Sequence, residues 1–274
     1  MRTKTERDKG MSQLVDLNGR AIPNENERVY AIKDRQYFCL QQPELNLATI
    51  YGRYVEYLGE ELLSDLSLDE FSNKFNHLLD RVANDLTCSF LLKGVHVPFI
   101  LPQKDLLGKQ PIDSLIQKVS TSFTGSFPKY EFRKLSKIDL DKDLKVSENS
   151  RWDILGQEWN HKLIVGIYFP TALSGFAIPD HVSVISRFPR YLVLSGIPEA
   201  ASSFIGSPNI LMKTDGKYPN LLALSAFSNQ DKEQSHMFHF FEAYGWNLYF
   251  NQRSNIGAVS EYYSGGLSAI DISL

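Results

Sequence analysis

The chain has 274 residues, enough for one large domain or two small ones, and its 43% hydrophobic and 22% charged residues are ordinary for a globular protein. Its 29 Lys and Arg stand against 32 Asp and Glu, and the formal net charge of −3 excludes the basic excess typical of nucleic-acid-binding proteins. The two cysteines, Cys39 and Cys88, form no CxxC motif and are too few for a disulfide framework, which favours a reducing, cytoplasmic location.

The N-terminal residues MRTKTERDKGMSQ are charged and contain no apolar stretch, so we expect neither a secretory signal nor a membrane anchor. Residues 1–28 are predicted to be disordered or extended, and either Met1 or Met11 could be the start of translation. Residues 29–274 are predicted to form a single domain.

Two amphipathic helices are predicted in the first third of the chain. Residues 43–63 carry apolar side chains at helical spacing, namely Leu47, Ile50, Tyr51, Tyr54, Tyr57 and Leu58. Residues 67–86 begin with Ser67 and Glu70, which have the spacing of a capping box. The apolar stripe of this second segment is Phe71, Phe75, Leu78, Leu79 and Val82. The short link between the two segments indicates a helical hairpin.

A strand and a third helix are expected next. In residues 90–102 the apolar residues Val95, Val97, Phe99 and Leu101 occupy every second position, which is typical of a strand. Pro111 is expected to begin the third helix. Residues 125–151 are polar and of mixed charge, so they are interpreted as a linker, an insertion or a surface hairpin at 129–135.

Asp139, Asp141 and Asp143 begin like a calcium-binding loop. Such a loop needs glycine at its sixth position and glutamate at its twelfth. Here Leu144 and Ser150 occupy those positions, so a solvated run of charges is the better interpretation.

The stretch 163–179 tests for a membrane span, because it carries no charge between Lys162 and Asp180. A spanning helix needs about 20 apolar residues, and Pro170, Ser174 and Gly175 interrupt this shorter stretch. We therefore expect two buried strands around a turn and no membrane partner.

The second half of the chain is rich in predicted strands. These are residues 162–169, 190–196, 220–227, 246–252 and 267–274. One short helix is expected at 198–206, with Pro198 in its first turn. Helices first and strands later predict the α+β class, with N-terminal helices packed on a mostly antiparallel sheet formed largely by the second half.

The segment HMFHFFEAYGWNLYFN, 236–251, raises the question of a metal site at His236, His239 and Glu242. In a helix, His236 and Glu242 would lie about 9 Å apart along the axis, too far for one zinc ion. In a strand, His236 and His239 would point to opposite faces. We expect a strand with its histidines at the margin, although a site combining one of them with His161 or His181 stays open.

A hydrolase site is the second chemical alternative, with Asp180, His181 and Ser195 as candidate catalytic residues. A nucleophile elbow needs glycine two residues before and after the serine, where this chain has Val193 and Ile197. The turn at Gly196 could instead present free amides to an anion.

Aromatic residues make up 12% of the chain, and Trp246, Tyr249, Tyr262 and Tyr263 are the candidates for contact with a ligand or a partner. Neither GxGxxG nor GxxxxGK[ST] occurs, so no nucleotide cofactor is expected.

The helix at 66–82, the strand segment HVPFILP, the strand KLIVGIYF and the aromatic C-terminal third together resemble a family of uncharacterised bacterial proteins. The resemblance spans roughly residues 45–270 and implies a single α+β domain. It implies no catalytic residues, and the polar stretch 125–151 departs from the family pattern.

Two functions are compatible with these patterns. The favoured hypothesis is a non-catalytic cytoplasmic protein that binds a partner protein or a small ligand, without nucleic acid, membrane or cofactor. The alternative is a hydrolase, metal-dependent or not, whose site is assembled from dispersed His, Asp and Glu residues.

Overall fold

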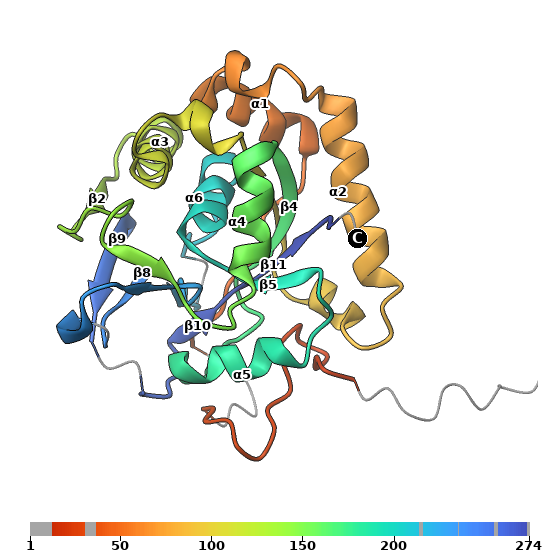
Figure 1. The fold of residues 1–274 in the computed structure, drawn as a ribbon, viewed down its shortest axis with the longest axis vertical. Helices are drawn as coiled ribbons and strands as arrows, with labels where there is room; N and C mark the ends of the chain where they lie inside the picture. The colour runs from red at the N-terminus through yellow and green to blue at the C-terminus, as the bar shows by residue number, and fades with distance from the viewer. Residues whose placement is uncertain (1–12, 31–36, 214–215, 235, 255–256, 273–274) are drawn as a thin grey trace, which may run out of the picture.

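A computed structural model describes residues 13–30, 37–213, 216–234, 236–254 and 257–272 (Figure 1). The α-helices are α1 Leu47–Leu58, α2 Leu68–Ala83, α3 Pro111–Ser126, α4 Trp152–His161, α5 His181–Ser186 and α6 Ile197–Gly206. The strands are β1 Val97–Leu101, β2 Phe132–Lys134, β3 Leu144–Val146, β4 Ile164–Phe169, β5 Leu192–Leu194, β6 Leu221–Ala223, β7 Phe227–Asn229, β8 Phe238–Tyr244, β9 Asn247–Arg253, β10 Tyr263–Gly265 and β11 Leu267–Ile270. The predicted α+β class is confirmed, because the helices lie mostly in the N-terminal part and the strands mostly in the second half.

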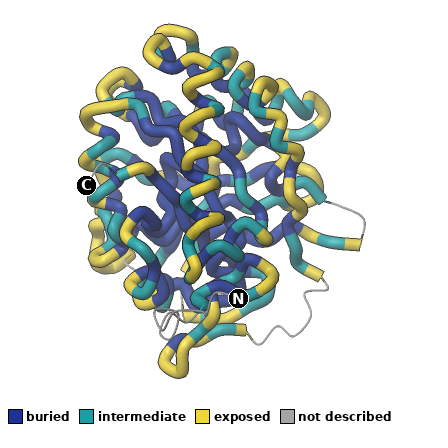
Figure 2. Tube along the Cα trace, turned by 90° about the vertical axis from the view of Figure 1, so that its right-hand side faces the viewer, coloured by how far each residue is buried: buried dark blue, intermediate teal, exposed yellow. Residues whose placement is uncertain are grey.

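Helices α2 and α3 begin where their sequences indicate, whereas α1 begins at Leu47 rather than at the predicted Pro43. The Ser67 hydroxyl accepts a hydrogen bond from the Glu70 amide, and the Glu70 carboxylate accepts one from the Ser67 amide at 2.8 Å, so the capping box of α2 is confirmed. Helix α1 is capped by Asn46, whose side chain accepts from the Thr49 amide. Pro111 is the first residue of α3, as expected. Figure 2 shows the result, with exposed outer faces of the helices around a buried centre.

A four-stranded sheet in the order β1-β4-β11-β5 is antiparallel throughout. Every residue of its strand β4 is buried. Helix α2 packs on β4 and helix α6 packs on β1, and Figure 1 shows α2 on one side of this sheet with α4 and α6 on the other. The free edge of β1 is closed by side chains, because the Ser202 hydroxyl bonds both the amide and the carbonyl of Ile100, and Tyr54 donates to the Pro98 carbonyl.

A five-stranded sheet has the order β10-β6-β8-β9-β2. Strands β8 and β9 form an antiparallel hairpin whose turn contains Gly245 at φ 65°, a left-handed conformation that favours glycine. The pairs β6–β8 and β8–β9 are antiparallel, whereas β10–β6 and β2–β9 are parallel. A separate pair, β3 with β7, is antiparallel.

Two local predictions are wrong. The surface hairpin at 129–135 is not formed, because β2 pairs with β9, and the stretch 125–151 also contributes β3, which pairs with β7. After β4 the chain turns rather than forming a second buried strand, since Pro170 has no amide hydrogen and Gly175 adopts φ 83°. Helices α4 and α5 were not anticipated from the sequence.

Residues 13–28 follow the extended rather than the disordered alternative, and residues 1–12 lie outside the described part of the chain. Val15 and Ala21 form a bridge and are both fully buried, and the Ala21 amide donates to the Ala172 carbonyl at 2.7 Å. Glu27 is buried and accepts from Arg187 at 2.8 Å. Among the helices of the described ranges, none is long and apolar enough to cross a membrane.

Gly166 in the middle of β4 has no room for a side chain, because a Cβ there would overlap the ring of Phe99 on β1. We expect Gly166→Ala to lower the free energy of unfolding by about 2 kcal/mol through overpacking. Urea unfolding followed by circular dichroism measures the change. The double variant Gly166→Ala/Phe99→Leu should recover part of the loss relative to Phe99→Leu alone, and a neutral single variant would contradict the packing described here.

Candidate functional site

The five-stranded sheet turns one face to the main core, and the opposite face is called the outer face here. Because successive side chains of a strand point to opposite sides, alternate residues belong to each face. The outer-face residues of β8 and β9 are Phe238, Phe240, Glu242, Tyr244, Asn247, Tyr249, Asn251 and Arg253. The inward set, which includes Phe241, Leu248 and Phe250, is buried in the main core.

A network of aromatic and charged side chains crosses the outer face. The Arg253 guanidinium lies 4.8 Å from the centre of the Phe240 ring and 3.7 Å from the Glu242 carboxylate. The Tyr262 hydroxyl donates to the same carboxylate at 2.6 Å. Burial, followed by the hydrogen bond to Glu242 and the charge of that carboxylate, raises the pKa of Tyr262, so the phenol stays protonated and keeps donating. The network holds these side chains in place on rigid strands.

Exposed aromatic rings flank this network at both ends. Trp246 in the hairpin turn is 41% exposed and stacks on Tyr130 with ring centres 5.7 Å apart. At the other end Tyr37 stacks on Tyr218 at 4.8 Å, and Phe38 lies 4.8 Å from Tyr262. The name aromatic surface is used below for Tyr37, Phe38, Tyr130, Tyr218, Tyr244, Trp246, Tyr249 and Tyr262, together with Glu242 and Arg253.

Of the four aromatic residues predicted for binding, the structure places Trp246, Tyr249 and Tyr262 on this surface. Tyr263 differs, because it is 9% exposed and packs with Phe238 in a smaller apolar cluster. Its strand lies parallel to β6 with Tyr263 opposite Leu221, so the ring lies on the outer face but is covered within this cluster. Tyr263 therefore supports the surface from beneath.

The candidate metal ligands do not converge. The predicted strand is confirmed, and it places His239 and Glu242 on opposite faces of β8, while His236 is exposed in the preceding turn. His239 is not at the margin as expected but fully buried, stacked on Phe250 and 3.4 Å from the Ser136 hydroxyl. This burial lowers the pKa of His239 to about 4, so the ring is neutral at pH 7.

The candidate hydrolase residues are each bonded to other groups. The Asp180 carboxylate accepts from the Arg28 side chain at 2.8 Å and from its amide at 2.7 Å. His181 is buried with Nδ1 2.9 Å from the Ser225 hydroxyl, and burial lowers its pKa to about 4. The buried Ser195 hydroxyl lies 2.8 Å from that of Ser268. No hydrogen bond connects Asp180, His181 and Ser195, all three of which are described. His161, the other open histidine, is exposed at the end of α4.

The buried carboxylate of Glu199 was not predicted from the sequence. Glu199 in α6 is fully buried, and it accepts hydrogen bonds from the Gly196 amide at 2.6 Å and the Trp152 indole at 3.0 Å. Burial raises the pKa of Glu199 to about 7. The amide at the helix start does bind a carboxyl group, but this group is the protein's own Glu199 side chain. The spacing of Gly196 and Glu199, three residues apart, was the available signal.

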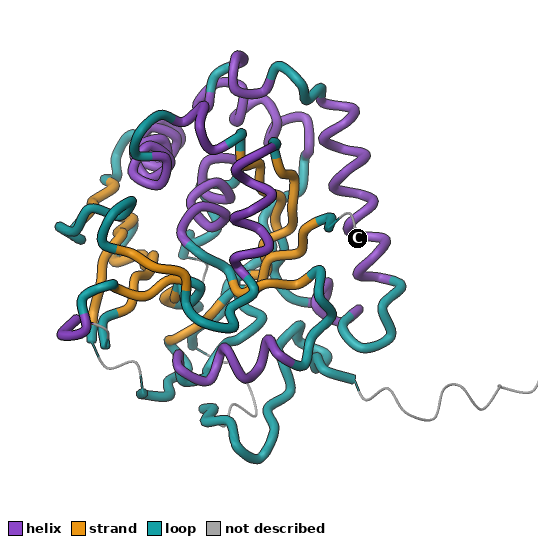
Figure 3. The backbone as a smooth tube through the Cα atoms, in the orientation of Figure 1, coloured by secondary structure: helices purple, strands orange, loops and turns teal. Residues whose placement is uncertain are grey.

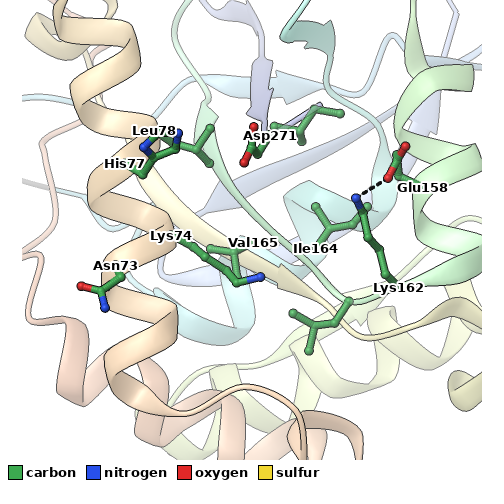
Figure 4. Close-up of a pocket in the computed structure, with 11 residues that line it drawn as sticks. Asn73, Lys74, His77, Leu78, Glu158, Lys162, Ile164, Val165 and Asp271 are labelled. Atoms are coloured by element: carbon green, nitrogen blue, oxygen red, sulfur yellow. Dashed lines mark ion pairs between the residues drawn. The ribbon is translucent and has the colours of Figure 1, made fainter. Parts of the chain in front are cut away.

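A groove of about 390 Å³ lies between α2, the end of α4 and the start of β4 (Figure 4). Lys74 and His77 of α2 stand on one wall, and the Lys162–Glu158 ion pair stands on the other. The apolar floor consists of Leu78, Leu163, Ile164, Val165 and Ile270. None of the predicted site residues lines it, and its positive and negative side chains are nearly balanced.

The aspartates of the rejected calcium loop meet a third carboxylate. Oxygen atoms of Asp113, Asp139 and Asp141 lie within 4.8 Å of one another. Asp141 accepts from the Ile112 amide at 3.0 Å, which caps α3, and Asp139 pairs with Lys142. Asp113 pairs with Lys134, so each carboxylate already has a partner within the protein.

A scan against protein-family models, a search of the curated proteins and a search of the solved structures found no match to this chain. The resemblance to uncharacterised bacterial proteins therefore stays a prediction. The interpretation of the site rests on its geometry.

The raised pKa of Glu199 predicts how stability depends on pH. The unfolded carboxyl ionises near 4.5 and the folded one near 7, so the folded state loses stability as pH rises between these values. We expect Glu199→Gln to gain stability relative to the natural chain over that interval, by about 3 kcal/mol at pH 8 compared with pH 4. Urea unfolding at several pH values measures it.

The control for this experiment is Glu148→Gln, because Glu148 is exposed. Its stability should follow the natural chain at every pH. Parallel pH profiles for Glu199→Gln and the natural chain would show that Glu199 does not titrate between pH 4 and 8.

Proposed function

We propose that the protein is a non-catalytic cytoplasmic protein that binds a partner protein through the aromatic surface. What supports this is the network of Tyr262, Glu242 and Arg253 on the outer face, flanked by exposed rings. Large aromatic side chains and arginine are enriched among the residues that contribute most to binding at protein interfaces.

The shape of the surface favours a protein over a small ligand. Small-molecule sites are concave and enclose most of the ligand. The aromatic surface instead extends over a strand hairpin and its flanks, and its residues line none of the grooves formed by α1 and α2. A protein partner can cover an extended face of this kind.

The surface is also organised before any partner arrives. Tyr249 and Glu242 lie opposite each other on paired strands, and the hydroxyl of Tyr262 is already bonded. Trp246 is held against Tyr130 by stacking. Because these rings lose little freedom on binding, the entropic cost of association is small.

The candidate hydrolase residues and the two cysteines support a protein that is non-catalytic and cytoplasmic. The side chains of the hydrolase alternative are buried or paired elsewhere, as with Ser195 and Asp180. Cys39 and Cys88 are both free thiols, which is usual in a reducing compartment.

The double variant Trp246→Ala/Tyr249→Ala tests the proposal. We expect it to lose the proteins that co-purify with the tagged natural chain, because truncating interface anchors typically costs about 2 kcal/mol or more each. Quantitative mass spectrometry identifies the partner, and calorimetry with the purified partner then measures the change in affinity.

The matched control is Tyr30→Ala, since Tyr30 is 42% exposed and lies outside the aromatic surface. It should retain the partner, and circular dichroism should show all variants folded. Equal recovery of the partner by the double variant and the natural chain would refute the proposal.

A further inference from the structure

An open groove of about 930 Å³ lies between α1, the short helix Glu60–Leu63 and the start of α2. It shares no residue with the aromatic surface. Figure 1 shows α1 and α2 on one side of the molecule and the β8–β9 hairpin on the other. The groove is therefore a second, independent surface.

The floor of this groove is apolar. Tyr51 and Val55 of α1 are half-buried, and Leu63 and Leu66 beneath them are 3% and 2% exposed. The Tyr51 hydroxyl donates to the Leu66 carbonyl, so the polar end of this ring is already satisfied. The accessible apolar surface of the floor comes mainly from the half-buried Tyr51 and Val55.

The rim of the groove carries negative charge only. Its charged residues are Glu60, Glu61 and Glu70. Glu70 is engaged at the cap of α2, whereas the exposed Glu60 and Glu61 form no ion pair or hydrogen bond within the described ranges. The nearby Lys118 amine donates to the carbonyls of Tyr57 and Leu58 and interacts with Glu61 through its charge alone. An acidic rim over an apolar floor is complementary to a surface that is both basic and apolar.

A glycine in the groove is unexplained by the protein's own packing. Gly52 lies in the middle of α1, is exposed, and a Cβ added there would meet nothing within 4 Å. Glycine inside a helix is less stable than alanine by about 1 kcal/mol. Ala48 stands one turn earlier on the same side and also lines the groove. Small side chains at both positions leave room for another backbone to approach α1 closely.

We propose that this groove binds a basic amphipathic helix of a partner protein. The apolar side of that helix rests on Tyr51 and Val55, and its lysine or arginine side chains reach Glu60 and Glu61. A helix fits better than an extended segment because the groove is walled by helices and contains no strand edge to which a strand could be added. The small residues of α1 mark the line of closest approach.

The probe is a fluorescein-labelled synthetic peptide helix with leucine along one side and lysine along the other, titrated into the full chain and followed by fluorescence anisotropy. We expect saturable binding that Glu60→Lys/Glu61→Lys weakens by at least about tenfold. The control Glu148→Lys/Glu233→Lys reverses two exposed carboxylates outside the groove, and its affinity should stay within about twofold.

Gly52→Ala separates binding from folding. Its thermal midpoint should rise, because alanine favours the helix. Its affinity for the peptide should nevertheless fall by at least about threefold, because the added methyl group lies in the path of the bound helix. A variant that gains stability and keeps full affinity would overturn the close-approach argument.

Three other results would overturn the proposal. The first is unchanged affinity in Glu60→Lys/Glu61→Lys, or an equal loss in the control pair. The second is equally tight binding of a scrambled peptide with the same composition but no apolar side. The third is self-association of the natural chain in sedimentation velocity that disappears in Glu60→Lys/Glu61→Lys, which would assign the groove to a second copy of this chain.

Discussion

Helix α6 is buried along its whole length, and the fold is built around satisfying its polar groups. Figure 3 shows the helices grouped against the strands at the centre of the molecule. It contacts α1 and α3 on the helical side and β1 and β4 on the sheet side. A helix without an exposed face cannot rely on water, so each polar side chain needs a partner in the protein. Ser202 bonds the backbone of Ile100, Ser203 bonds the carbonyl of Glu199, and Glu199 bonds Gly196 and Trp152.

The position of α6 decides which surfaces remain free. Its contact with α1 uses the inner side of that helix, where Tyr54 also bonds the Ser202 carbonyl at 3.0 Å, so the opposite side with Gly52 is left outward. On the other flank Phe204 packs against Phe241, the inward residue of β8. That contact turns Phe240 and Glu242 to the outer face. One buried helix therefore orients both proposed binding surfaces.

The local elements were readable from the sequence because their signals are local. The capping box at Ser67, the alternation around Phe99 and the proline at 111 each act within a few residues. Strand β2 has no such signal, because its partner β9 lies more than a hundred positions later in the chain and supplies the pairing. The same reason explains Tyr263 and His239, whose burial depends on strands and rings contributed by distant segments. For Glu199 the spacing to Gly196 was visible, but its burial beside Trp152 was not.

Gly166 and Gly52 are two glycines with opposite surroundings. The protein's own packing explains why residue 166 is a glycine, because the Phe99 ring occupies the space that a side chain would need. Gly52 has open space around it and an ordinary helical backbone, so the folded chain alone would be more stable with alanine there. The exposed carboxylates of Glu60 and Glu61 in the same groove form no ion pair or hydrogen bond within the described chain. The proposed partner helix would account for both features, because it needs close approach at Gly52 and places positive charge opposite Glu60 and Glu61.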